Sequence, residues 1–218
     1  MSDDAGRGIM FKLAPTYKDY LWGGNRLKQS FNKDSDTTKV AESWEFSASE
    51  YGMSMIVTGK YAGKSLKEVV PLFDGTFFFG SNYVAERGFP LLIKLIDADQ
   101  PLSIQVHPDD AYAEEVEHSL GKTEMWYVVD CEPDAFVYYG LNREVTKEEF
   151  LRRVIDNSLP EILNKVPVRR GDVFYIRPGT IHAIGGGIII CEFQENSNTT
   201  YRVYDYGRRD KDGNLREL

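Results

Sequence analysis

The stretch GDVFYIRPGTIHAI, residues 171–184, joins a strand-forming run to a tight turn and a histidine. Residues 172–177 are mostly β-branched or aromatic, a composition that favours a β-strand. Pro178-Gly179 then marks a tight turn. His182 follows closely, so the stretch predicts a strand, a turn and, just after the turn, a candidate metal ligand.

A second histidine lies in LSIQVHPDD, residues 102–110, which also has the composition of a strand. Residues i and i+2 of a strand point to the same face, so Gln105 and His107 are predicted to project together. An amide oxygen and an imidazole nitrogen at this spacing can both reach one divalent ion, such as Zn²⁺ or Fe²⁺. The pair alone leaves a structural alternative open, in which it belongs to an ordinary strand.

A carboxylate that would complete such a site is Glu124, at the start of the hydrophobic run EMWYVVDC, residues 124–131. Burying an unpaired carboxylate costs several kcal/mol. A bound cation would offset that cost, and so would the nearby Lys122. The alternative is a glutamate that begins its strand at the surface. Together with the two histidine stretches, Glu124 predicts a metal site whose ligands come from three separate strands.

The rest of the chain also favours strands over helices. Further β-branched or aromatic runs, bounded by turn residues, occur at 91–96, 187–193 and 199–206. Strands at this spacing with few helices predict a mainly β chain, built as a β-sandwich or jelly-roll barrel with a few decorating helices.

Three short helices are predicted from their N-terminal signals. Ser65-x-x-Glu68 and Thr146-x-x-Glu149 have the pattern of capping boxes. A third helix is expected to start near Asp109. After Thr146 the apolar spacing predicts one buried helix face, formed by Phe150, Leu151, Val154 and Ile155.

Composition excludes several classes of function. The chain has 218 residues, 42% of them hydrophobic, which is enough for a substantial core. A net charge of −8 argues against a broad nucleic-acid or anionic-lipid surface. No run approaches membrane-spanning length, and the N-terminal MSDDAGRG lacks the apolar core of a signal peptide. Cys131 and Cys191 are predicted to be small buried hydrophobes rather than a disulfide, which favours a cytoplasmic location.

Residues 171–184 resemble the second motif of the cupin superfamily, G-x5-P-x-G-x2-H. Gly171, Gly179 and His182 fall on its positions, and Arg177 replaces the expected proline. Over nearly the whole chain the sequence also resembles the type I phosphomannose isomerases in their short bacterial form. The stretches that carry this resemblance are WGG (22–24), ESWEFS (42–47), KLIDADQPLSIQVHPDD (94–110), GKTEMWY (121–127), GTIHAIGGG (179–187) and TTYRVYDYGR (199–208).

This resemblance implies a cupin-type jelly-roll barrel that binds one Zn²⁺ per chain through Gln105, His107, Glu124 and His182. It implies an isomerase that interconverts mannose 6-phosphate and fructose 6-phosphate through an enediolate. We expect a monomer or homodimer and a single catalytic domain over residues 1–218, with N-terminal strands and a cap in 1–88 and the metal-binding barrel core in 89–207. Because members usually continue into a further β-rich domain, the resemblance also implies that a C-terminal domain is missing.

The reaction needs a base next to C1 and C2 of the sugar. Glu192, in the apolar run 187–193, matches an acidic family position, and burial would raise its pKa. Lys122 is the second candidate, and the sequence does not decide between them. Arg202 matches the active-site arginine of the family. The expected substrate contacts are Arg208 for the phosphate, Ser103 and Lys94, while Trp22, Trp44 and Glu45 either shape the pocket or belong to the core.

Two other functions remain open at this point. Two histidines and one carboxylate also describe the facial triad of an iron cupin dioxygenase. A cupin that binds a sugar without turning it over is the other alternative. The remaining histidine, His118, is expected at the surface end of a helix rather than at the metal.

Overall fold

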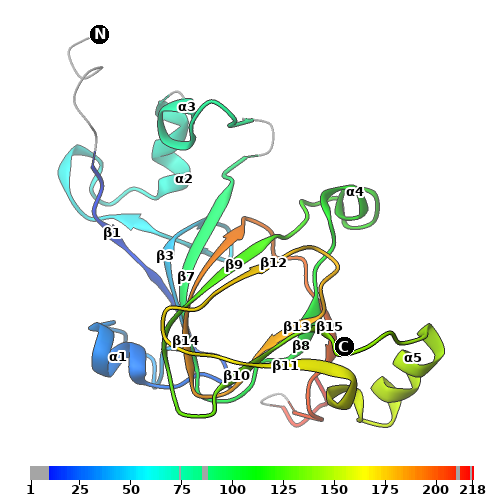
Figure 1. Cartoon of the computed structure of the whole chain (residues 1–218). Helices are drawn as coiled ribbons and strands as arrows, with labels where there is room; N and C mark the ends of the chain where they lie inside the picture. The colour runs from blue at the N-terminus through cyan, green and yellow to red at the C-terminus, as the bar shows by residue number, and fades with distance from the viewer. Residues whose placement is uncertain (1–9, 74, 85–87, 210–211, 217) are drawn as a thin grey trace.

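Two antiparallel sheets form the framework of the fold (Figure 1). The computed structural model describes residues 10–73, 75–84, 88–209, 212–216 and 218. One sheet has six strands in the order β12-β9-β14-β7-β3-β2, and the other has five in the order β11-β10-β13-β8-β15. Within these described residues the mainly β prediction is confirmed.

The six-stranded sheet contains β2 (Thr16–Lys18), β3 (Glu42–Phe46), β7 (Leu91–Ala98), β9 (Glu124–Cys131), β12 (Val173–Ile176) and β14 (Ile188–Glu195). The five-stranded sheet contains β8 (Ile104–Val106), β10 (Phe136–Leu141), β11 (Leu163–Pro167), β13 (His182–Ile184) and β15 (Tyr201–Tyr204). Two small ribbons pair β1 (Leu13–Ala14) with β6 (Met55–Ile56) and β4 (Ala48–Ser49) with β5 (Gly52–Met53).

The helices are short. They are α1 (Arg26–Phe31), α2 (Leu66–Val69), α3 (Gly75–Phe79), α4 (Asp110–Tyr112) and α5 (Lys147–Ile155). Single turns of 3₁₀ helix cover Gly59–Tyr61, Val70–Leu72 and Leu159–Ile162, and a π-helical turn covers Ala113–Glu117. None of the described helices is long and apolar enough to cross a membrane.

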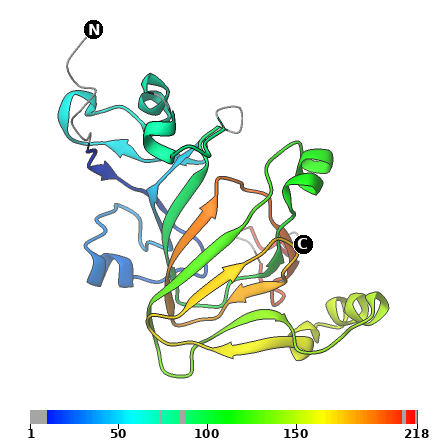
Figure 2. The same cartoon turned by 45° about the horizontal axis from the view of Figure 1, so that its top comes forward.

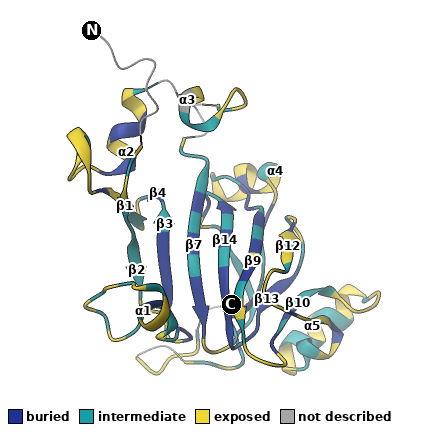
Figure 3. Cartoon of the chain, turned by 60° about the vertical axis from the view of Figure 1, so that its left-hand side comes forward, coloured by how far each residue is buried: buried dark blue, intermediate teal, exposed yellow. Residues whose placement is uncertain are grey.

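The main core fills the space between the two sheets. Ile96, Trp126 and Ile190 from the six-stranded sheet pack in one cluster with Val137 and Ile184 from the five-stranded sheet. Alternate residues of a strand face opposite sides of its sheet. The residues between these core positions therefore lie on the outer faces of the two sheets. Figure 3 shows the buried segments running along β3, β7, β14 and β9.

Smaller clusters cover the outer faces. Helix α1 brings Leu27 against Ile189 on the outside of the six-stranded sheet. On the outside of the five-stranded sheet, Ile104 packs with Leu159 and Ile162. Ile104 therefore faces away from the barrel interior, which leaves the neighbouring Gln105 to face inward, as the alternation in this strand requires.

The strands predicted from composition are confirmed, with small changes at their ends. Strand β8 covers only Ile104–Val106, so Ser103 precedes it and His107 follows it. Strand β13 begins at His182, directly after the Pro178-Gly179 turn. The local sequence thus puts both histidines at strand ends, where a side chain can turn into the interior.

Of the two predicted capping boxes, one forms and one does not. At Ser65 the hydroxyl accepts from the Glu68 amide and the Glu68 carboxylate accepts from the Ser65 amide, as predicted. At the start of α5, Thr146 Oγ1 accepts from the Glu149 amide at 3.2 Å, but the reciprocal bond is not made. The prediction of a second complete box is therefore wrong.

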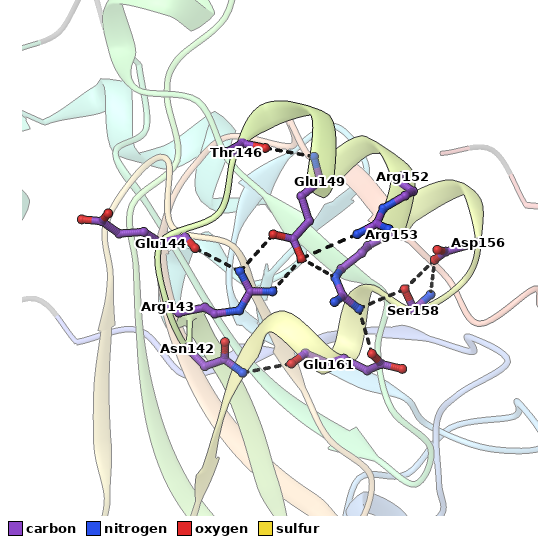
Figure 4. A network of polar contacts seen from close by, with 10 residues as sticks. All are labelled: Asn142, Arg143, Glu144, Thr146, Glu149, Arg152, Arg153, Asp156, Ser158 and Glu161. Atoms are coloured by element: carbon purple, nitrogen blue, oxygen red, sulfur yellow. Dashed lines mark hydrogen bonds and ion pairs between the residues drawn. The ribbon is translucent and has the colours of Figure 1, made fainter.

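Two arginines explain why that box is incomplete (Figure 4). Arg143 donates to both oxygens of Glu149, at 2.6 and 2.9 Å, and Arg153 Nε donates to Glu149 Oε1 at 2.9 Å. These contacts lower the pKa of Glu149 to about 2, through hydrogen bonds from Arg143 first and Arg153 second. A carboxylate held by two guanidinium groups is not available to cap the Thr146 amide.

Helix α5 also corrects the predicted apolar face. Phe150 and Val154 pack on the cluster around Ile104, but the exposed fraction is 50% for Leu151 and 80% for Ile155. Residues i and i+4 share a helix face, whereas i+1 is rotated about 100° from it. Because α5 lies at the outside of the five-stranded sheet and contacts the protein on one side (Figure 2), only the 150–154 pair is covered.

Both cysteines are free, as predicted, but they are only partly buried rather than fully buried. The division of the chain at residues 88 and 89, the oligomeric state and the cytoplasmic location stay predictions.

Candidate metal centre and active-site pocket

Three side chains that the sequence singled out meet inside the barrel. His107 follows β8, Glu124 begins β9 and His182 begins β13. Their nearest ligand atoms all lie within 4.8 Å of one another, and all three residues are buried. His107 Nε2 is 3.2 Å from Glu124 Oε1, and His182 Nε2 is 3.8 Å from Glu124 Oε2.

The protonation states of this cluster suit a cation. Burial lowers the pKa of His182, and burial followed by the charge of Lys122 lowers the pKa of His107 to about 4, so both rings are neutral at pH 7. His182 Nδ1 lies 2.8 Å from the carbonyl oxygen of Thr180, which fixes Nδ1 as the N–H donor and leaves Nε2 with a lone pair. Burial opposes the ionisation of Glu124, yet Lys122 at 2.9 Å and His107 hold its pKa well below the usual value.

Buried nitrogen atoms without partners test whether a metal fits. Both ring nitrogens of His107 and Nε2 of His182 are buried and have no hydrogen-bond partner among the described residues. Such atoms are costly unless something satisfies them. Two imidazole nitrogens and a carboxylate oxygen are a donor set that suits Zn²⁺ and related ions. The residues present therefore fit a divalent metal.

Gln105 lies beside this cluster. In the antiparallel pairing of β8 its Cα partner is His182 on one side and Arg202 of β15 on the other. Its side chain lines the same pocket as Glu124.

A pocket of about 320 Å³ opens next to the cluster. Among its lining residues are seven that the sequence predicted for the site: Lys94, Ser103, Gln105, Lys122, Glu124, Glu192 and Arg202. Trp22 and Trp44 line it as well. Glu45 does not, and pairs with Lys33 at 2.6 Å instead. Most of the predicted polar site residues are thus brought together in one cavity.

A larger cavity of about 720 Å³ lies beside the pocket and shares Trp44 and Asn198 with it. Apart from Glu50 and Lys67, which pair with each other at 2.6 Å, its lining consists of uncharged residues. The smaller pocket is the stronger candidate for the chemical site, because the buried charged side chains converge there.

The floor of the pocket is a row of side chains that crosses four strands. In the strand pairing Trp44 of β3 stands opposite Lys94 of β7, Lys94 opposite Glu192 of β14, and Glu192 opposite Trp126 of β9. Lys94 Nζ lies 2.9 Å from Glu192 Oε1 and 3.8 Å from an oxygen of Glu42. Against the effect of burial, these two carboxylates raise the pKa of Lys94, so it is charged at pH 7.

Trp126 connects this row to the cluster of His107, Glu124 and His182. Its indole Nε1 donates to Glu192 Oε2 at 2.9 Å and to Glu124 Oε2 at 3.1 Å. Burial, together with the negative charge of Glu124, raises the pKa of Glu192. This direction is the one predicted for a buried carboxylate that acts as a base.

The arginines predicted for the substrate are in different situations. Arg202 lines the pocket, and its Nε donates to Ser103 Oγ at 3.3 Å. Arg208 does not line the pocket. Its Nη1 donates to the carbonyl of Pro101 at 2.7 Å, and its Nε and Nη2 donate to Asp205. His118 caps the π-helical turn and is exposed, as predicted.

Sequence reasoning missed Glu42, Trp126 and Arg216. The first two had a signal, because the spacing Glu-x-Trp occurs at both 42–44 and 124–126. In each pair the indole donates to the glutamate two residues before it. Arg216 also lines the pocket and had no such signal.

Comparison with known proteins gives consistent results. The family described as "Phosphomannose isomerase type I, catalytic domain" matches residues 10–134. Mannose-6-phosphate isomerase ManA of Bacillus subtilis is 44% identical over 96% of this chain and 64% of its own length. The mannose-6-phosphate isomerase of Streptococcus mutans is 43% identical over 91% of this chain and 61% of its own length.

A crystal structure of the mannose 6-phosphate isomerase from Bacillus subtilis has the same fold, with a TM-score of 0.86 and 39% identity. The match covers 94% of this chain and 64% of that one. The similarity supports the cupin-type barrel expected from the sequence. The chain thus spans less than two thirds of the length of these relatives.

Proposed function

The chain belongs to the type I phosphomannose isomerases, and we propose that it interconverts mannose 6-phosphate and fructose 6-phosphate with one bound zinc ion. The observation that carries this proposal is the convergence of His107, Glu124 and His182 beside a pocket that contains Glu192 and Arg202. Gln105 is the proposed fourth ligand, since it lines the same pocket as Glu124.

The reaction moves a proton between C1 and C2 of the open-chain sugar, and negative charge develops on O1 and O2. Zinc, when bound, supplies a Lewis acid that stabilises this charge. In our proposal the Glu192 carboxylate takes the proton from one carbon and returns it to the other. Trp126 and Lys94 contact its two oxygens, which keeps the carboxylate in one orientation.

Three cations have separate proposed roles. Lys122 pairs with Glu124 at 2.9 Å, and this contact favours Lys122 as a charge partner of the ligand over Lys122 as the base. Arg202, held by Ser103, would donate to a hydroxyl or to the developing oxyanion of the sugar. Lys94 is bound by two carboxylates in the pocket floor, so its proposed role is to position Glu192 rather than to contact the phosphate.

A coupled assay for fructose 6-phosphate tests the function. Wild-type activity should disappear with a chelator and return with Zn²⁺. His107→Ala should lose both metal and turnover. The matched control is His118→Asn, because His118 is an exposed histidine at positive φ, a conformation that asparagine tolerates. Turnover that persists in His107→Ala would refute the proposed centre.

Measurements on the same purified protein distinguish the isomerase from an iron dioxygenase and from a sugar-binding protein. An iron cupin dioxygenase would contain iron and consume O₂, and its cluster would also be two histidines and a carboxylate. A binding protein would retain zinc and sugar phosphate without forming product. Elemental analysis of the purified chain alongside the assay distinguishes all three.

A further inference from the structure

Four cations line the active-site pocket, and two of them are neutralised within it. Lys94 and Lys122 each lie 2.9 Å from a lining glutamate. Arg216 pairs with none of the glutamates that line the pocket. In sequence Arg216 lies beyond residues 89–207, which were predicted to form the barrel core, yet it lines the pocket inside the barrel.

The segment that carries Arg216 is closed on itself. Arg209 and Leu215 form an antiparallel bridge, and the Arg216 amide donates to the carbonyl of Arg208 at 3.2 Å. This closure puts Arg216 beside Asp205, which is 3% exposed. Arg216 Nη1 donates to Asp205 Oδ2 at 2.8 Å.

Asp205 binds two arginines that differ in how many of their guanidinium nitrogens are already hydrogen-bonded. Arg208 uses all three of its side-chain nitrogens, on Asp205 and on the carbonyl of Pro101. Arg216 uses only Nη1, and among the described residues Asp205 is the only partner of its side chain. Its Nε and Nη2, the edge of the guanidinium that binds oxyanions in a bidentate manner, remain for a ligand.

The charge of this group also favours an anion. One buried carboxylate holds two guanidinium groups, so the group formed by Asp205, Arg208 and Arg216 keeps one net positive charge. Of the two arginines only Arg216 lines the pocket, so that charge can be presented to a bound molecule only through Arg216.

We propose that Arg216, positioned by Asp205, binds the phosphate of the sugar substrate, in the role that the sequence assigned to Arg208. The proposal rests on the proposed isomerase function and specifies how it selects phosphorylated sugars. Losing a bidentate, charge-assisted contact of this kind corresponds to a loss of about 10–100-fold in affinity. The contact is remote from C1 and C2, so it should contribute to substrate binding and little to the chemical step.

The test compares Arg216→Ala and Arg216→Lys with wild type. The matched control is Arg209→Ala, because Arg209 belongs to the same segment, donates to the carbonyl of Gly213 and does not line the pocket. Steady-state kinetics should give Arg216→Ala a KM for mannose 6-phosphate raised about 10–100-fold with kcat within a few fold of wild type. The KM of Arg216→Lys should lie between those of wild type and Arg216→Ala, and the KM of the Arg209→Ala control should match wild type. Activity on unphosphorylated mannose should not change in any of them.

Calorimetric titration with inorganic phosphate provides a readout that does not depend on turnover. The affinity for phosphate should fall in Arg216→Ala and not in Arg209→Ala. Wild-type KM and wild-type phosphate affinity in both Arg216 variants would overturn the proposal, and so would a loss of kcat at unchanged KM. A wild-type chain without isomerase activity would refute the proposed function, while the phosphate titration would still decide the role of Arg216.

Discussion

Replacing Lys94 with methionine should strongly destabilise the protein. Lys94 lies between Glu42 and Glu192, at 3.8 and 2.9 Å, and the side chains of all three are at most 10% exposed. Methionine has a similar length and fills the space without charge. The substitution therefore removes the cation and leaves two buried carboxylates without it.

The magnitude follows from this geometry. Removing one partner of a buried ion pair costs about 3–5 kcal/mol, because the remaining charge stays desolvated. Lys94, Glu42 and Glu192 are all buried, so solvent screens their charges only weakly and does not greatly reduce this cost. For a chain of this size 1 kcal/mol corresponds to about 2–4 °C in Tm, so the expected loss is roughly 6–20 °C.

The loss should also depend on pH. Without Lys94 the pKa of Glu192, already raised by burial, rises further above its unfolded value. A carboxyl group with a raised folded pKa destabilises the fold only when it is ionised. The penalty should therefore be absent below about pH 4.3 and grow as the pH rises through the folded pKa.

Thermal unfolding of Lys94→Met and of the double variant Lys94→Met/Glu42→Gln, between pH 5 and 8, measures these effects. The second substitution should recover part of the loss, because it removes one of the two unpaired charges. If Lys94→Met unfolds within about 2 °C of wild type at pH 8, the ion pairs do not stabilise the pocket floor and this reasoning fails.

Three further predictions concern single side chains. Trp126→Phe removes a hydrogen-bond donor to two buried carboxylates, so it should lower the free energy of unfolding by about 3 kcal/mol and weaken metal binding. Trp44→Phe removes a donor to one carboxylate and should leave the metal affinity unchanged. Denaturant unfolding and metal titration of both variants measure these two effects. Gly185→Ala should cost about 1–3 kcal/mol in denaturant unfolding, because its Cβ would lie 2.2 Å from the carbonyl oxygen of Phe136. Glu149→Gln should lower Tm at pH 6, because the arginine contacts stabilise only the ionised carboxylate. The difference in Tm from wild type should disappear as the pH falls from the pKa of a glutamate in the unfolded chain towards the folded pKa of about 2. A difference that persists at pH 2 would contradict the arginine contacts.

Much of the fold and the convergence of His107, Glu124 and His182 could be predicted from the sequence because their signals are local. Composition and turn residues locate strands such as β9 and β14 almost to the residue. The i, i+2 spacing put Gln105 and His107 on one side of the chain, and the Pro178-Gly179 turn placed His182 at the start of its strand. These features depend on residues that are neighbours in the sequence, so one sequence is enough to predict them.

What could not be predicted depends on partners that are distant in sequence. The contact of Lys94 with Glu192 follows from the register of β7 and β14, which no local pattern specifies. The position of Arg216 depends on its contact with Asp205, eleven residues earlier in the chain. At α5 the apolar spacing was real, but only tertiary packing decides that Ile155 is exposed.

In the proposed centre His107, Glu124 and His182 bind a single metal ion. The X-ray absorption spectrum of the zinc-loaded chain tests it most directly. We predict nitrogen and oxygen ligands at about 2.0–2.2 Å, with the outer-shell scattering of two imidazole rings and no sulfur at about 2.3 Å. A sulfur shell, or the absence of imidazole scattering, would place the metal elsewhere and contradict the account.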